Sequence, residues 1–134
     1  MEKKKILYVD DDPDQVEQNK LLLESKGYFV LTAFSGKEGW EVYKQNKPDA
    51  VVIDLIMEEH DSGFILSYKI KKEAHGKRIP VFIVTSAAYL TGFKFGTSTD
   101  EEREWIKCDA ILNKPVVPDE LLQKLDEFWA LHQA

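Results

Sequence analysis

Five short apolar segments recur along the chain, and a stretch with helix signals follows each of them. The segments are rich in β-branched residues and lack a regular polar alternation, which is typical of strands covered on both faces of a sheet. They lie at Lys5–Val9, Tyr28–Thr32, Ala50–Ile53, Pro80–Thr85 and Asp109–Leu112. Strands that alternate with helices in this way predict an α/β fold with a parallel sheet between two helical layers.

Helix signals in the connections support this order. Asp12-Pro13 is a good helix start, and Ser35-Gly-Lys-Glu38 and Thr99-Asp-Glu-Glu102 have the spacing of a capping box. The five predicted helices run from Pro13 to a stop at Gly27, over Ser35–Asn46, Gly63–Glu73 and Thr99–Ile106, and onward from Pro118. In the first helix, Val16, Leu22 and Leu23 are expected to face the core. The predicted architecture is one domain over residues 1–134, with five parallel strands and five helices on both faces of the sheet.

Composition narrows the class of protein. Among 134 residues, 24 acidic and 18 basic side chains give a formal net charge of −6, which argues against direct binding to nucleic acid or to an anionic membrane. Cys108 is the only cysteine, so no intramolecular disulfide is expected, and no apolar run approaches the length of a membrane span. His60, His75 and His132 lack metal-ligand spacing and are expected to face solvent. A cytoplasmic location fits these features best.

Polar side chains follow four of the five predicted strands at the point where each strand ends. These are Asp10, Asp11 and Asp12 after the first strand, Asp54 after the third, Thr85 at the end of the fourth and Lys114 after the fifth. Because right-handed crossovers place the carboxyl ends of parallel strands at one edge of the sheet, these groups are expected to converge there.

The predicted edge has a distinct chemistry. Two carboxylates about 4 Å apart repel by roughly 4 kcal/mol at an effective dielectric near 20, so an acidic group of this kind favours a cation. All-oxygen ligands suit Mg²⁺, a lysine and a hydroxyl can hold phosphoryl oxygens, and an aspartate can attack phosphorus. The residues therefore indicate Mg²⁺-assisted phosphoryl transfer onto a carboxylate.

The motifs in this order resemble the receiver domains of two-component response regulators. The resemblance covers roughly Lys5 to Leu131 and rests on Ile6–Asp11, Val52–Leu55, Pro80–Thr85 and Asn113-Lys114-Pro115. It implies a flavodoxin-like fold with strand order 2-1-3-4-5. It also implies that the chain accepts a phosphoryl group from a histidine kinase or a phosphotransfer protein and then acts on an effector protein or on an output domain that this chain lacks.

The resemblance also implies a role for each matching residue. Asp54 would be the phosphoacceptor, and Mg²⁺ would be held by Asp10 through water, by Asp11, by Asp54 and by the backbone carbonyl of Ile56. Thr85 and Lys114 would contact the phosphoryl group. Ile111 stands where the family usually has an aromatic switch residue. Such a protein is a regulator that catalyses only its own phosphorylation and dephosphorylation.

The residues also allow two other interpretations of the function. A phosphatase of the haloacid dehalogenase type would use Asp10 as its nucleophile, with Thr85 and Lys114 as later motifs. That reading leaves Asp54 without a role, and the acidic pair expected after the lysine is absent. The other alternative is a receiver-like interaction module that is never phosphorylated.

Overall fold

The predicted parallel sheet is present in the structure, a computed structural model that describes residues 3–54, 62–85, 109–113 and 117–131. Five parallel strands pair in the order β2-β1-β3-β4-β5. They are β1 (Lys5–Val9), β2 (Phe29–Ala33), β3 (Ala50–Asp54), β4 (Val81–Thr85) and β5 (Ala110–Asn113). The strand order and the parallel pairing confirm the fold class expected from the sequence.

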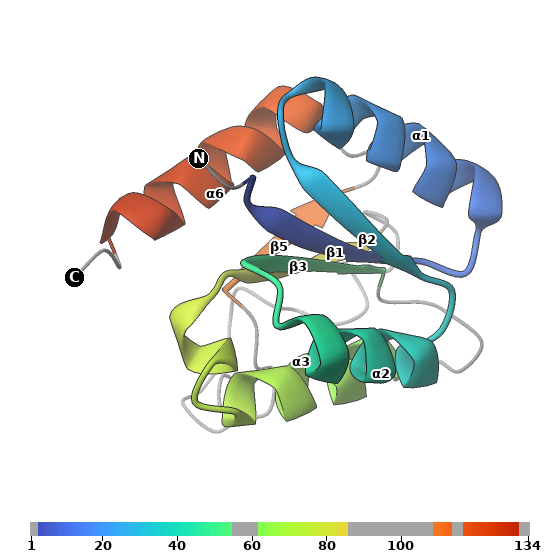
Figure 1. The fold of residues 1–134 in the computed structure, drawn as a ribbon, viewed down its shortest axis with the longest axis vertical. Helices are drawn as coiled ribbons and strands as arrows, with labels where there is room; N and C mark the ends of the chain where they lie inside the picture. The colour runs from blue at the N-terminus through green and yellow to red at the C-terminus, as the bar shows by residue number, and fades with distance from the viewer. Residues whose placement is uncertain (1–2, 55–61, 86–108, 114–116, 132–134) are drawn as a thin grey trace.

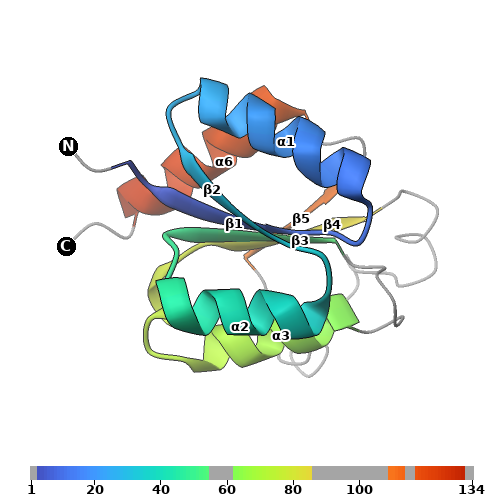
Figure 2. The ribbon, with the colours of Figure 1, turned by 45° about the vertical axis from the view of Figure 1, so that its right-hand side comes forward.

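Helices cover both faces of this sheet. The α-helices of the described residues are α1 (Pro13–Ser25), α2 (Gly36–Asn46), α3 (Ser62–Lys72) and α6 (Pro118–Leu131), and a 3-10 turn, η1, spans Gly76–Arg78. Helices α1 and α6 lie on one face, and α2 and α3 lie on the other (Figures 1 and 2). Four of the five predicted helices are thus found, and the fifth, over Thr99–Ile106, lies outside the described residues. No helix in the described ranges is long and apolar enough to span a membrane.

The sheet divides the core into two apolar clusters. Val16 and Leu23 of α1 and Leu125 of α6 pack on one face, while Tyr43 of α2 and Leu66 of α3 pack on the other. Every residue of β3 and β4 is buried, which explains why these strands show no polar alternation.

The inner face of α1 differs from the prediction. Leu22 is 43% exposed, and the buried residues of the helix are Val16, Asn19 and Leu23. Asn19 tolerates burial because its Nδ2 donates to the Tyr8 hydroxyl at 3.1 Å and to the Gln15 carbonyl at 2.8 Å. The inner face of α1 therefore contains Asn19, held by a tertiary hydrogen bond, instead of the predicted Leu22.

Strand register sets up the acidic edge of the sheet. Val9 of β1 pairs with Ile53 of β3, so the next residues, Asp10 and Asp54, end neighbouring strands at the same level. Asp10 continues the pairing on the other side, because its N–H donates to the Ala33 carbonyl of β2 at 3.1 Å. The backbone of Asp10 is thereby bound to the end of β2.

Candidate functional site

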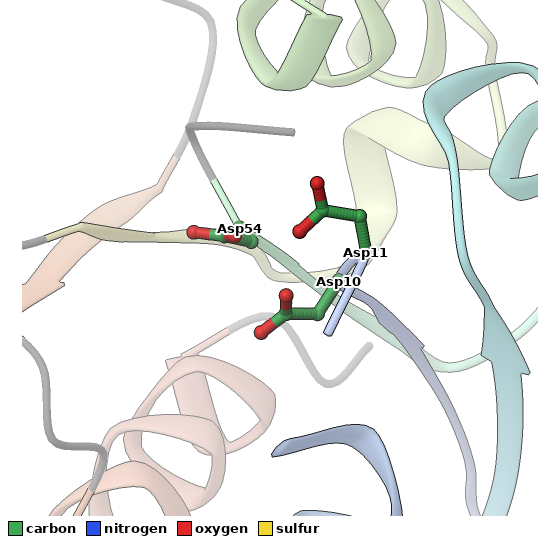
Figure 3. A group of neighbouring side chains, drawn as sticks. All are labelled: Asp10, Asp11 and Asp54. Carbon is green, nitrogen blue, oxygen red and sulfur yellow. The ribbon is translucent and has the colours of Figure 1, made fainter. Parts of the chain in front are cut away.

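Three aspartates meet at the carboxyl edge of the sheet. Asp10 and Asp11 follow β1, Asp54 ends β3, and each offers a carboxylate oxygen within 4.8 Å of the others' (Figure 3). Asp10 is 1% exposed and Asp54 is 5% exposed, whereas Asp11 is open to solvent. The edge expected from the sequence therefore brings together its three predicted carboxylates, two of them buried.

The three consecutive aspartates in the turn after β1 have different roles. Asp10 Oδ1 accepts a hydrogen bond from the Asp12 N–H at 3.0 Å, which closes a tight turn. Asp12 points the other way and caps α1, because its carboxylate accepts from the Asp14 N–H at 3.0 Å. Asp12 is thus the helix cap, as expected, while Asp10 and Asp11 remain at the site.

The cluster creates a negative potential that reaches into the core. Burial raises the pKa of the Tyr8 hydroxyl, and the charges of Asp10 and Asp54 raise it further. Tyr8 lies in β1, two residues before Asp10, and it is buried. Tyr8 was not predicted to lie near the site, because a tyrosine within an apolar strand carries no signal beyond that of a core residue.

Thr85 and Ile111 lie on the next two strands. Thr85 ends β4, directly after Val84, the residue that pairs with Asp54. It is 2% exposed, and its hydroxyl has no hydrogen-bond partner among the described residues. A buried hydroxyl of this kind retains a donor for an incoming acceptor. Ile111 lies half-buried in β5, opposite Ile83. Ile56 and Lys114 lie outside the described residues.

Comparison with known proteins identifies the family. The family model of the response regulator receiver domain matches residues 6–126, and the chain belongs to this family. Over 129 residues it is 37% identical to the transcriptional regulatory protein GlrR of Escherichia coli K12, which covers 96% of this chain but 26% of GlrR. Over 126 residues it is 33% identical to the protein PilH of Pseudomonas aeruginosa, covering 94% of this chain and 98% of PilH. The chain thus spans about a quarter of the first relative and nearly all of the second.

Solved structures agree with this assignment. A CheY-like receiver domain protein from Methanospirillum hungatei superposes with a TM-score of 0.80 at 27% identity, covering 98% of this chain and 97% of its own. The response regulator TrrA of Thermotoga maritima, solved with Mg²⁺ and BeF, gives a TM-score of 0.74 at 26% identity, covering 93% and 98%. The chain is therefore a receiver domain of two-component signalling, and neither alternative reading is favoured.

Proposed function

We propose that Asp54 accepts a phosphoryl group and that Asp10, Asp11 and Asp54 bind the Mg²⁺ ion required for this transfer. The observation that carries the proposal is the convergence of these three carboxylates at the ends of β1 and β3. A neighbour in the same family, TrrA, was solved with Mg²⁺ and BeF, which supports the choice of metal.

The donor set of this chain fits Mg²⁺. Mg²⁺ prefers oxygen ligands and is commonly bound through one or two carboxylates. Each of the three aspartates offers a carboxylate oxygen within 4.8 Å of the others', so together they could hold one such ion. The backbone carbonyl of Ile56 is the proposed third protein ligand after Asp11 and Asp54, with Asp10 acting through water. When bound, Mg²⁺ would neutralise charge on the carboxylates and on the phosphoryl oxygens.

The proposed reaction is an in-line displacement at phosphorus. A carboxylate oxygen of Asp54 forms the new P–O bond while the P–N bond to the phosphohistidine of the kinase breaks, and the histidine nitrogen keeps the electron pair and takes up a proton. Thr85 is proposed to donate its hydroxyl to one phosphoryl oxygen, and Lys114 to pair with another through its ammonium. Ile111 on β5 would pack against the Thr85 side chain when that side chain turns towards the phosphoryl group.

The proposal makes the chain a regulator rather than an enzyme with an external substrate. It would catalyse only its own phosphorylation and the loss of the phosphoryl group. Residues 1–134 are proposed to form one receiver domain that takes its phosphoryl group from a histidine kinase or a phosphotransfer protein. The new charge would then alter a surface read by an effector protein or by an output domain. A single cysteine supports a reducing, cytoplasmic location.

Locating the phosphoryl group tests this function. The protein is incubated with acetyl phosphate and Mg²⁺, the acyl phosphate is trapped by borohydride reduction, and the modified aspartate is identified by peptide mass spectrometry. Modification at Asp54 is expected. Modification at Asp10 would instead support a phosphatase nucleophile, and the absence of modification with any small phosphodonor would support a module that is never phosphorylated.

A further inference from the structure

The two helical layers carry opposite charge. The acidic layer, α1 and α6, holds seven carboxylates and two lysines: Asp14, Glu17, Glu24, Asp119, Glu120, Asp126 and Glu127, with Lys20 and Lys124. The basic layer, α2 and α3, holds five lysines and two glutamates: Lys37, Lys44, Lys69, Lys71 and Lys72, with Glu38 and Glu41. Because the layers lie on opposite faces of the sheet (Figure 2), the net charge of −6 conceals a strongly polarised molecule.

A half-buried aromatic ring of the basic layer, Trp40, stacks on Tyr43 and lies near two ammonium groups. The Trp40 ring on α2 lies 5.5 Å from Lys44 Nζ and 5.8 Å from Lys69 Nζ, measured to the ring centroid. Lys44 also pairs with Glu41 at 3.3 Å. Among the described residues, neither Lys37 nor Lys69 has a carboxylate within 4 Å. Cations held around one ring repel one another, so a carboxylate brought to this surface would relieve the repulsion.

Helix dipoles explain some of these lysines but not all of them. Cations stabilise the last turn of a helix, and Lys44 and Lys69 lie in last turns. Lys37, however, lies in the first turn of α2, where the helix dipole disfavours a cation. Moreover, α1 and α6 have no basic residue in their last turns, although Lys26 is the C-cap of α1. The helix dipole therefore does not account for Lys37, whereas Lys71 has a structural partner in Asp109.

The acidic layer carries the complementary pattern. Glu17, Leu21 and Glu24 form an exposed stripe on α1, and Leu21 is 58% exposed. The two glutamates are seven residues apart, as are Lys37 and Lys44, so each pair of charges spans about 10 Å along its helix. Each pair encloses one large apolar residue.

The two stripes match in one antiparallel register. With α1 set against α2, Glu17 meets Lys44, Leu21 meets Trp40 and Glu24 meets Lys37, without a gap or a shift. Both ion pairs and the apolar contact form together, and Lys69 adds a cation near the centre. The partner whose charges fit the basic layer is therefore the acidic layer of another molecule of this protein.

We propose that copies of this chain associate head to tail, with α1 of one copy on α2 and α3 of the next. The two surfaces differ and lie on opposite faces, so the contact is heterologous and does not close into a dimer. Association is weak and salt-sensitive, because its charges are exposed. It goes beyond the proposed phosphorylation and does not depend on it.

Sedimentation velocity over a concentration series tests the proposal, in EDTA and without a phosphodonor. The weight-average sedimentation coefficient is expected to rise with concentration at 0.01 M salt, where the Debye length is about 30 Å, and to stay at the monomer value at 1 M salt, where it is about 3 Å. Glu17→Lys/Glu24→Lys and Lys37→Glu/Lys44→Glu should each weaken association by about tenfold or more, because attraction becomes repulsion. Circular dichroism checks that both variants are folded.

Mixing the two charge-reversed variants provides the decisive experiment. An equimolar mixture of the two variants should associate again, because every junction between unlike copies then joins opposite charges. A matched control, Lys3→Glu/Lys77→Glu, has the same net charge as the lysine variant, and both substituted residues are exposed outside the stripe; it should associate like the unmodified chain. A chain that stays monomeric at low salt, variants that associate unchanged, or a mixture that stays monomeric would each overturn the proposal.

Discussion

Lys71 of α3 donates a hydrogen bond of 2.8 Å to Oδ2 of Asp109, the residue directly before β5. The same oxygen accepts the Val81 N–H at 2.8 Å, and Lys71 Nζ also donates to the Ile79 carbonyl at 3.0 Å. One carboxylate thus ties the start of β5 to the start of β4 and to the end of α3. This clamp lies at the amino edge of the sheet, opposite the acidic site.

We predict that Asp109→Ala lowers the free energy of unfolding by about 2 kcal/mol, because it leaves the buried Val81 N–H without its acceptor and the Lys71 ammonium with only the Ile79 carbonyl. Urea denaturation followed by circular dichroism measures the change. Glu41→Gln is the matched control, since it breaks the exposed Lys44–Glu41 pair and should cost less than about 0.5 kcal/mol. Equal effects of the two substitutions would contradict the clamp.

The Tyr43 hydroxyl is buried and has no hydrogen-bond partner among the described residues. We predict that Tyr43→Phe raises the free energy of unfolding by up to about 1 kcal/mol, because it removes an unsatisfied polar group and keeps the ring. The ring contacts with Trp40 and His75, at 5.6 and 5.8 Å between centroids, should persist. A loss of stability would show that the hydroxyl is satisfied in solution.

The raised pKa of Tyr43 also predicts that the free energy of unfolding depends on pH. Burial, together with the charge of Glu73, raises the pKa of Tyr43 from 10.0 to about 12. Above pH 10 the unfolded chain loses this proton while the folded chain keeps it, so stability falls as the pH rises towards 12. Its share of the slope approaches at most about 1.4 kcal/mol per pH unit, between pH 10 and 12, and is smaller below pH 10. Denaturation series at pH 9 to 11 should show a shallower loss in Tyr43→Phe, and an unchanged slope would contradict this assignment.

Two glycines should respond very differently to alanine. A Cβ on Gly76 would lie 1.7 Å from the Ile70 carbonyl oxygen, so the turn after α3 must open to admit it. Gly27, beyond the end of α1, has a φ of +97° but nothing within 4 Å of its Cβ position. We predict a loss of about 3 kcal/mol or more for Gly76→Ala and about 1 kcal/mol for Gly27→Ala, measured by thermal unfolding. The reverse order would contradict the close approach in the turn.

Magnesium affinity should depend on which aspartate is changed. Asp11→Asn removes one charged oxygen from the proposed ligand set, and we predict at least a tenfold weaker Mg²⁺ affinity by isothermal titration calorimetry. Asp12→Asn is the matched control. Asparagine caps helices as well as aspartate does, and Asp12 serves α1 rather than the site, so the affinity should change by less than about threefold. Equal losses in both variants would indicate a diffuse electrostatic effect rather than a ligand set.

Local patterns were sufficient to predict the strands and the acidic edge. Continuous apolar runs ended at Asp10 and Asp54, and parallel pairing necessarily brings such strand ends together. The packing of individual side chains was less accessible. Leu22 was expected inside, but helical periodicity also permits the stripe through Asn19, and only the Tyr8 hydroxyl, from another element, makes that stripe favourable. His75 was expected to face solvent, yet it is half-buried, with Nε2 2.8 Å from the Pro48 carbonyl.

The clamp between Lys71 and Asp109 could not be predicted from local sequence patterns either, because its partners are 38 residues apart. Thr85 was identified as a strand end, but its unsatisfied hydroxyl emerges only from the burial of β4. The roles assigned to the site residues stay predictions, and two of these residues, Ile56 and Lys114, lie outside the described ranges.

We propose that Asp54 takes up one phosphoryl group in a Mg²⁺-dependent reaction. Intact-protein mass spectrometry after incubation with acetyl phosphate tests it most directly, with Mg²⁺ or with EDTA. We predict that the unmodified chain and the control Asp14→Asn, an exposed residue of α1, gain the mass of one phosphoryl group only with Mg²⁺, and that Asp54→Asn gains none. A phosphoryl gain in Asp54→Asn equal to that of the unmodified chain, or none in the unmodified chain, would contradict the claim.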